Sequence, residues 1–370
     1  MPKIELINVT KKWGSFVAVD HLTMVIEDRE FVTLLGPSGC GKTTTLRMIA
    51  GLETPTEGKI VIGDRIVYDS TTGVNISPAK RDIGFLFQNY ALWPHMTVYK
   101  NISFGLENLK WKKADIDARV EEVMKTLRIE EFRNRYPNEI SGGQQQRVAI
   151  ARTLAPRPQV LFMDEPLSNL DAKLRGEMRT ELKRLHKDTD STFVYVTHDQ
   201  LEAMTLATRT CLLDKGLMQQ YDKPLTIYNN PANLFVADFV GSPTMNFIPA
   251  RAKKVSERKV ALEFLNIKVN FTSKGPIDLA SDQVIVGIRP EFLLVKENGP
   301  IEGLAYSTLP SGMETTVKIN LDSTILSAVQ FGAVDYAFDQ KIQFDIVGDT
   351  IVLFDPASKK SIAIGSCQVL

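Results

Sequence analysis

The sequence contains 370 residues, and its 44 lysines and arginines balance its 44 aspartates and glutamates, so the formal net charge is zero. A neutral chain gives no support for bulk electrostatic attraction to nucleic acid. Apolar residues make up 44% and charged residues 24%, which is typical of a soluble globular protein with a buried core, and the length predicts two or three domains.

Cysteine content and apolar runs narrow the class further. Cys40, Cys211 and Cys367 are too few for a disulfide framework in a chain of this length, and they fit a reducing cytosol. The segment Met1–Glu5 lacks the apolar run of a secretory signal. The sequence also contains no run of about 18 apolar residues, the length needed to span a bilayer. If the protein serves transport, we expect the membrane pore to belong to other chains.

Up to about residue 235, short apolar runs alternate with helical patterns. The buried strands predicted from these runs are Phe31–Leu35, Val160–Met163, Thr192–Val196 and Thr210–Leu213. Helices are predicted at Asp171–Lys187 and Asp199–Ala207. Strands that alternate with helices indicate a mostly parallel sheet with helices on its faces.

Residues 97–156 contain no comparable strand and are predicted to be helical. Ala114–Leu127 is amphipathic, with Ile116, Val120, Val123 and Leu127 on one stripe. The sequence therefore predicts a helical subdomain, over about residues 89–156, inserted between strands of the sheet.

Beyond about Phe235 the pattern changes to short β-rich segments separated by turn residues. These segments are Val260–Asn270, Val284–Ile288, Thr315–Leu321 and Lys341–Ile346. We therefore expect an α/β nucleotide-binding domain over residues 1–235 and a small, barrel-like all-β domain over residues 236–370.

The segment Gly36–Thr43, with the sequence GPSGCGKT, matches the P-loop pattern and lies between a predicted strand and a predicted helix. Glycines allow the backbone N–H groups to surround a phosphate chain, and the helix N-terminus adds a positive partial charge. Lys42 is expected to reach the β- and γ-phosphates, and the Thr43 hydroxyl is expected to ligate Mg²⁺. A chance glycine-rich turn is the alternative, and the strand–loop–helix context argues against it.

Two acidic residues follow the buried strand at Val160–Met163. Asp164 is expected at the carboxyl end of that strand, where it can hold Mg²⁺ opposite Thr43. Glu165 is expected to act as the general base that polarises the attacking water. An acidic pair in a turn is common by itself, but its combination with the phosphate loop indicates a nucleotide-hydrolysing site.

The segment Ile140–Gln144, with the sequence ISGGQ, precedes a predicted helix through Val148 and Leu154. Ser141 is a natural N-cap, and two glycines after it leave backbone N–H groups open. This is a second anion-binding helix terminus in the chain, separated from Lys42 by the helical insertion. A simple capped helix is the alternative if the segment is considered alone.

These motifs together resemble the ATP-binding-cassette ATPases over residues 1 to about 235, and most of all the ATP-binding subunits of carbohydrate importers. In that family the ISGGQ-type segment of one subunit closes over the γ-phosphate held by the P-loop of the other. The family pattern normally starts with Leu, and we expect the apolar Ile140 to have little effect.

Cassette ATPases that act on DNA insert long coiled coils before this segment, and translation factors carry two cassettes, so neither fits this chain.

The resemblance assigns further residues on the cassette. Trp13 matches the aromatic that stacks on adenine, with a half-buried core Trp as the alternative. Gln88 matches the glutamine that contacts Mg²⁺ and the attacking water, and Ser168–Asp171 matches a loop that communicates across the dimer. His198 matches the histidine that contacts the γ-phosphate and supports Glu165.

Two further matches concern the second domain. Gly241–Asn246 (GSPTMN) and Gly287–Glu291 (GIRPE) resemble segments of the C-terminal regulatory domain of sugar importers, an oligonucleotide-binding-like β-barrel. Without the resemblance, Arg289 and Glu291 would be interpreted as a strand-ending turn with a surface ion pair.

The resemblance and the motifs together predict one shared site with ATP and Mg²⁺ as cofactors. The expected catalytic residues are Glu165, His198 and Gln88. The expected nucleotide-binding residues are Trp13, Gly36, Pro37, Ser38, Gly39, Cys40, Gly41, Lys42, Thr43 and Thr44, with Ser141, Gly142, Gly143 and Gln144 from a second copy of the chain. The expected Mg²⁺ ligands are Thr43, Gln88 and Asp164.

The expected function is hydrolysis of ATP to energise import of a sugar or oligosaccharide, from a peripheral position on the cytoplasmic face of the membrane. The expected partners are a second copy, membrane permease subunits, indirectly an extracellular solute-binding protein, and a regulatory protein on the C-terminal domain, but no nucleic acid. The alternative cargoes are glycerol phosphate, a polyamine or an inorganic ion.

Two residues near these motifs are expected to take no part in the chemistry. Cys40 occupies a free position of the P-loop motif, where the nearby helix N-terminus is expected to lower its pKa and make it modifiable but not catalytic. His95 lies in an exposed loop after Gln88 and is not expected to be a ligand.

Overall fold

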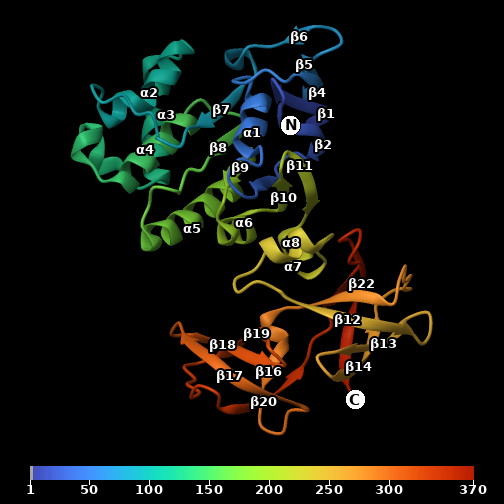
Figure 1. Cartoon of the computed structure of the whole chain (residues 1–370). Coiled ribbons are helices and arrows are strands. Elements are labelled where there is room, and N and C mark those ends of the chain that lie inside the picture. Colours follow the sequence, from blue (N-terminus) through green and yellow to red (C-terminus); the bar gives the residue numbers. More distant parts are fainter. Residues whose placement is uncertain (1–2) are drawn as a thin grey trace. The chain divides into compact units, whose positions relative to one another are not determined.

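The computed structural model describes residues 3–370, which form two compact units that divide between Pro224 and Leu225 (Figure 1). The domain boundary expected near residue 235 falls within the short helix α8, Leu234–Phe239. No helix of the described residues is long and apolar enough to cross a membrane.

The first unit is built on a six-stranded sheet with the order β11-β10-β3-β9-β8-β7. The strands are β3 (Phe31–Leu35), β7 (Ile83–Leu86), β8 (Val160–Asp164), β9 (Thr192–Thr197), β10 (Arg209–Asp214) and β11 (Leu217–Asp222). All neighbours pair in parallel except the edge strand β11, which is antiparallel to β10. Every residue of β3, β8 and β9 is buried, as expected for parallel strands covered on both faces. The predicted strands and the parallel sheet are therefore confirmed.

Three helices follow strands of this sheet and bring their N-termini to its carboxyl edge. They are α1 (Lys42–Ala50) after β3, α5 (Ala172–Asp188) after β8, and α6 (Gln200–Leu206) after β9. In α5, Met178, Leu182 and Leu185 are the buried residues, at the three- and four-residue spacing of one helix face. The predicted helices at Asp171–Lys187 and Asp199–Ala207 are confirmed, and each of their ends lies within one residue of the prediction.

The helical insertion lies in the chain between the neighbouring strands β7 and β8. It contains α2 (Val98–Asn108), α3 (Lys113–Thr126) and α4 (Gly142–Leu154), and Figure 1 shows them gathered at one side of the sheet. The predicted stripe of α3, including Ile116, Val120 and Val123, is buried in their shared core. The predicted helical subdomain is confirmed.

The amino-terminal region forms a second, antiparallel sheet that the sequence pattern did not reveal. Its order is β2-β1-β4-β5-β6, with β1 (Ile4–Trp13), β2 (Phe16–Ile26), β4 (Glu57–Ile62), β5 (Arg65–Asp69) and β6 (Val74–Asn75). The β1–β2 register shifts at three places, beginning between Leu6 and Val9. Such bulges interrupt the alternation of apolar and polar residues by which a strand is predicted.

The second unit contains a closed antiparallel barrel with the order β12-β13-β14-β22-β21-β15. Its strands are β12 (Asn246–Lys254), β13 (Lys259–Phe264), β14 (Ile267–Ser273), β15 (Gln283–Ile288), β21 (Ile351–Phe354) and β22 (Ser361–Val369). The barrel-like prediction is confirmed. The run Val260–Asn270 is a hairpin of two strands, because Leu265 and Asn266 take positive φ angles of 47° and 60° and form its two-residue turn.

A separate five-stranded sheet in the second unit was not predicted. Its order is β16-β20-β17-β18-β19, with β16 (Leu293–Val295), β17 (Ile301–Pro310), β18 (Glu314–Leu321), β19 (Thr324–Phe331) and β20 (Lys341–Ile346). The buried amide of Asn246 connects it to the barrel, since its Nδ2 donates to the carbonyl oxygens of Ile288 and Ser327.

The structure corrects the interpretation of Arg289 as part of a surface ion pair. Arg289 is only 1% exposed, and its guanidinium donates to the carbonyl oxygens of Tyr228, Ala237 and Val240. It also lies 4.0 Å from the ring centroid of Tyr228, whose hydroxyl donates to Glu291 at 2.7 Å. Arg289 therefore fastens α7 (Pro224–Asn229) and α8 to the barrel strand that precedes it.

Replacing Arg289 with Met is expected to destabilise the second unit by about 3 kcal/mol, because buried carbonyl oxygens lose a charged donor. This change is measured by denaturant-induced unfolding, monitored through amide hydrogen exchange in the barrel strands. Arg258→Met, at an exposed position of the same barrel, is the matched control and should leave stability within about 0.5 kcal/mol. Equal stability of the two variants would contradict the anchoring role.

Candidate functional site

The phosphate loop lies between β3 and α1, as predicted. Gly41 precedes α1 with a φ of 103°, and a Cβ added there would lie 2.4 Å from the backbone oxygen of Ala18. Gly36, with a φ of 151°, is equally confined, since its Cβ would lie 2.2 Å from the backbone oxygen of Leu213. The backbone path of the loop therefore requires glycine at both ends. Pro37, Ser38, Gly39 and Thr44 complete the loop and the first turn.

Lys42 is buried, and its ammonium group lies inside the loop. The Nζ atom donates to the carbonyl oxygens of Gly36 at 2.8 Å and Pro37 at 2.9 Å. A buried ammonium group needs hydrogen-bond acceptors, and phosphate oxygens are acceptors that can take the place of these carbonyl oxygens.

Asp164 lies at the carboxyl end of β8 and contacts Thr43, the last residue of the phosphate loop. Thr43 Oγ1 donates to Asp164 Oδ1 at 2.8 Å, and Arg47 of α1 lies 3.4 Å from Asp164 Oδ2. Burial raises the pKa of Asp164, while the hydrogen bond from Thr43 and the charge of Arg47 act in the opposite direction. Thr43 and Asp164, which the sequence predicts as Mg²⁺ ligands, therefore lie in direct contact.

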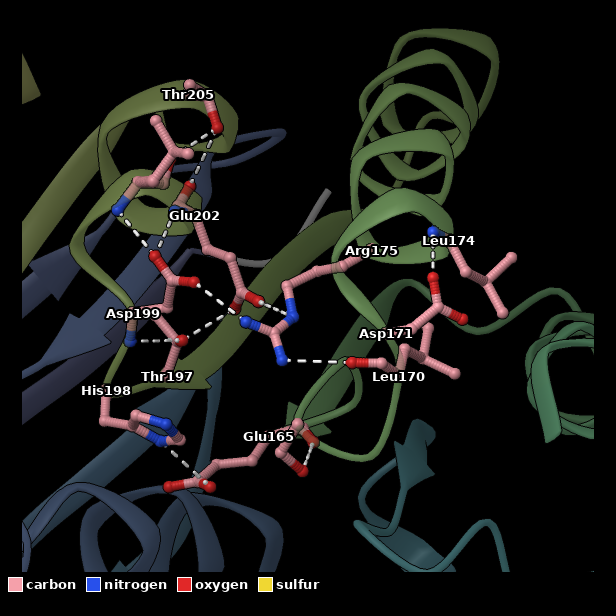
Figure 2. A network of polar contacts seen from close by, with 12 residues as sticks. Glu165, Leu170, Asp171, Leu174, Arg175, Thr197, His198, Asp199, Glu202 and Thr205 are labelled. Atoms are coloured by element: carbon pink, nitrogen blue, oxygen red, sulfur yellow. Dashed lines mark hydrogen bonds and ion pairs between the residues drawn. The ribbon is translucent and has the colours of Figure 1, made fainter. Parts of the chain in front are cut away.

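Glu165 lies directly after β8 and faces His198, which follows β9 (Figure 2). His198 Nδ1 is 3.2 Å from Glu165 Oε2. Glu165 has a positive φ of 47°, and its N–H donates to the carbonyl oxygen of Val196 at 3.1 Å. This left-handed turn directs the carboxylate towards the exposed imidazole and away from the strand.

Gln88 lies near the loop Ser168–Asp171. Its Nε2 donates to Ser168 Oγ at 3.5 Å, and Asn169 Nδ2 donates to the Gln88 carbonyl oxygen at 3.4 Å. Ser168 Oγ in turn donates to the carbonyl oxygen of Glu165 at 2.9 Å. Two successive hydrogen bonds through Ser168 Oγ, the first of them long, therefore join Gln88 to the backbone of Glu165.

Ser141 begins α4 with reciprocal capping bonds. The backbone N–H of Ser141 donates to Gln144 Oε1 at 2.8 Å, and the Gln144 N–H donates to Ser141 Oγ at 3.4 Å. Ser141 and Gly142 are exposed, whereas Gly143 is buried against Leu174 of α5. Among residues 3–370, no hydrogen bond or ion pair joins this segment to Lys42, Thr43 or Asp164. The described residues therefore show no direct polar link between the N-terminus of α4 and the phosphate loop of the same chain.

Trp13 lies at the tip of the β1–β2 hairpin and is 47% exposed. Its ring stacks on Phe16 with 6.2 Å between centroids and 4° between planes. Lys11 Nζ lies 5.4 Å from the Trp13 centroid. This exposed aromatic surface is available for stacking on a planar ligand.

The expectation for Cys40 was wrong in direction. Cys40 is buried, and burial raises the pKa of its thiol more than the neighbouring Lys42 lowers it. Cys211 is fully buried in β10, as expected, and burial raises the pKa of its thiol as well. His95 lies exposed in the loop after Gln88.

The oxygen atoms around Thr43 fit a divalent cation of the Mg²⁺ type. Mg²⁺ usually takes one or two protein oxygens and completes its shell with phosphates and water. One hydroxyl and one carboxylate, already 2.8 Å apart, provide such a pair, and the described residues hold no cluster of three or more metal-binding side chains.

Three further polar residues near His198 were not singled out in the sequence. Arg175, Asp199 and Glu202 form contacts that reach both the His198 segment and the Leu170 carbonyl oxygen. A Glu four residues after the histidine, at the start of a helix, was the available signal, but only the fold shows that it is buried.

The fold and these motifs define a P-loop ATPase of the ATP-binding-cassette class. Residues 19–168 match the ABC transporter family, and residues 241–293 match the MalK OB fold domain. A dimeric ATP-binding cassette in a post-hydrolysis state, bound to ADP and Pi, is 35% identical, with a TM-score of 0.52 over 60% of this chain and 98% of that chain.

Curated relatives cover most of the chain. The trehalose/maltose import ATP-binding protein of Thermococcus litoralis is 49% identical over 79% of both chains. The sn-glycerol-3-phosphate import ATP-binding protein of Ruegeria sp. is 43% identical over 98% of this chain and 100% of its own length. The maltose/maltodextrin import ATP-binding protein of Salmonella typhimurium is 45% identical over 87% of this chain and 86% of its own. The chain therefore belongs to the ABC transporter family of import ATP-binding proteins, and it is an ATPase.

Proposed function

We propose that two copies of this chain bind ATP at a shared interface and hydrolyse it to drive solute import through a separate membrane permease. The observation that carries the hydrolysis step of this proposal is the approach of His198 to Glu165 at 3.2 Å, beside the Thr43–Asp164 pair. A base held by an imidazole next to a phosphate loop is suited to activating water.

The residues of one copy take the following roles in this proposal. Lys42 and the N–H groups of the loop bind the phosphates, and Trp13 stacks on the adenine. Glu165 accepts the proton of the attacking water, while His198 holds the Glu165 carboxylate and contacts the γ-phosphate. Gln88 orients the water and relays the state of the site to the permease.

Thr43, Asp164 and Gln88 would hold Mg²⁺, which when bound neutralises charge on the phosphates. The Thr43–Asp164 pair supports this assignment directly. For Gln88 the support is its location beside Ser168, close to the Glu165 backbone.

The second copy supplies Ser141, Gly142, Gly143 and Gln144. Their support is the exposed, capped N-terminus of α4, which has N–H groups for an anion but no link to the Lys42 loop of its own chain. The similarity to a cassette solved as a dimer adds to this support. ATP then joins the copies and hydrolysis releases them, which moves the permease between two states.

For the cargo we propose a sugar or oligosaccharide, with glycerol phosphate as the second candidate. The trehalose/maltose and maltose/maltodextrin relatives favour a sugar, and the 43% identity to a glycerol-3-phosphate relative over 98% of the chain favours the second. The permease and an extracellular binding protein select the cargo, and this chain acts on the cytoplasmic face. The functional boundary is proposed near residue 235, with a regulatory role for the β-rich remainder.

The test is uptake into proteoliposomes that contain this chain and the permease encoded beside its gene, with the extracellular binding protein added outside. With ATP and Mg²⁺ enclosed, we expect uptake of labelled maltose or trehalose, and loss of uptake with EDTA. Uptake of sn-glycerol-3-phosphate alone would select the second cargo. ATP hydrolysis that responds to nucleic acid but never to the permease would overturn the transport function.

A further inference from the structure

The buried carboxylate of Glu202 lies beside the turn that carries His198 (Figure 2). Glu202 Oε2 accepts hydrogen bonds from Thr197 Oγ1 at 2.6 Å and from Tyr195 Oη at 2.8 Å. Thr197 Oγ1 also accepts from the backbone N–H of Asp199 at 2.9 Å. The Glu202 carboxylate therefore holds the Thr197 hydroxyl before His198, and that hydroxyl in turn holds the backbone of Asp199 after it.

Arg175 of α5 reaches the same cluster from the opposite direction. Its Nη1 lies 3.4 Å from Asp199 Oδ2, and its Nε lies 4.0 Å from Glu202 Oε1. Its Nη2 donates to the carbonyl oxygen of Leu170 at 3.1 Å. One guanidinium thus spans the His198 turn and the loop that ends at Asp171, the N-cap of α5.

The charge of the cluster makes its geometry restrictive. Glu202 is almost fully buried, and burial raises its pKa although the Thr197 and Tyr195 hydroxyls lower it. Arg175 is the cation that faces Glu202 and Asp199. A buried carboxylate is stabilised only if its donors stay in place, so displacement of either loop carries an electrostatic cost.

We infer that Glu202 and Arg175 are positioning residues that hold His198 and the Leu170–Asp171 turn in a fixed relation, and so set the orientation of His198 towards Glu165. This inference rests on the proposed roles of Glu165 and His198. The physical reason is that a shift of about 1 Å in a catalytic group costs on the order of 10²-fold in rate. A role in stability alone would lower the folded fraction without changing the turnover of the folded molecules.

The test compares Glu202→Gln and Arg175→Gln with two matched controls in the full chain. Gln at position 202 keeps an oxygen for the two hydroxyls but loses the charge that faces Arg175. The controls are Glu30→Gln and Arg209→Gln. Glu30 also pairs with an arginine, Arg209, at 3.0 Å and accepts from a tyrosine hydroxyl, Tyr221, at 3.4 Å. Glu30 and Arg209 precede and begin strands at the amino edge of the sheet, away from the carboxyl edge that carries the site.

We expect both test variants to lower kcat for ATP at least about tenfold with KM changed less than about twofold, and both controls to keep the wild-type kcat. In a His198→Ala background, Glu202→Gln should change kcat less than about twofold, since it acts through the imidazole. A full tenfold effect in that background, or a normal kcat in both test variants, would overturn the inference. If Glu202→Gln does not fold, the more exposed Arg175→Gln decides. Absence of ATPase activity in the unmodified chain would instead reject the proposed function.

Discussion

Replacing Glu165 with Gln is expected to lower the rate of ATP hydrolysis by about 10²–10⁴-fold, the range associated with loss of a general base. Gln has nearly the same shape but cannot accept the proton of the attacking water at neutral pH. ATP binding should persist, because Lys42 and the loop glycines are unchanged. The ATP-joined dimer should therefore accumulate.

Steady-state phosphate release and size-exclusion chromatography with ATP and Mg²⁺ measure the two effects. Glu302→Gln is the matched control, because Glu302 is an exposed carboxylate paired with Lys341 at 2.8 Å in the second unit. It should keep both the rate and the monomer–dimer distribution of the unmodified chain. A Glu165→Gln protein with normal turnover would remove Glu165 from the role of base.

The second large effect concerns the phosphate loop. Gly41→Ala is expected to weaken ATP binding by at least about 100-fold, for two additive reasons. A residue with a Cβ at φ 103° is strained by about 1–2 kcal/mol, and the Cβ would lie 2.4 Å from the backbone oxygen of Ala18. A backbone atom of a sheet strand cannot move away cheaply, so the loop must change its path.

Fluorescent-nucleotide titration measures this loss, and Gly73→Ala is the matched control. Gly73 has a positive φ of 73°, but no atom lies within 4 Å of its added Cβ, and it is in a turn between β5 and β6. This variant carries the same kind of backbone strain without the collision, and its affinity for ATP should equal that of the unmodified chain. Unchanged affinity in Gly41→Ala would show that the loop tolerates another path.

Much of the fold was predictable because local patterns carried it. Buried parallel strands such as Phe31–Leu35 are continuous apolar runs, and Ala114–Leu127 shows a clear helical stripe. The amino-terminal sheet was missed because its register shifts hide the alternation along β1. In the second unit, the sequence predicts one β-rich run where the structure has a hairpin, because the turn at Leu265 and Asn266 has only two residues.

The candidate site divides in the same way. The phosphate loop, the Asp164–Glu165 pair and the capped Ser141 segment were each recognisable because short motifs encode their own backbone conformation. Burial was less accessible from the sequence. Burial raises the pKa of Cys40, whereas the sequence predicts a lowered one. Arg289 is buried and anchors two helices, whereas the sequence alone indicates a surface ion pair.

The sequence by itself determined the class of chemistry, because phosphate binding and hydrolysis require particular residue types at fixed spacings. Those residues are the glycines around Lys42, the acidic pair after a buried strand and the ISGGQ segment. Only the tertiary structure decided which side chains meet. It brought His198 to 3.2 Å from Glu165 and placed Arg175 between Asp199 and the Leu170 carbonyl oxygen. The physical reason is that parallel strands end at one edge of the sheet, so residues far apart in the chain become neighbours there.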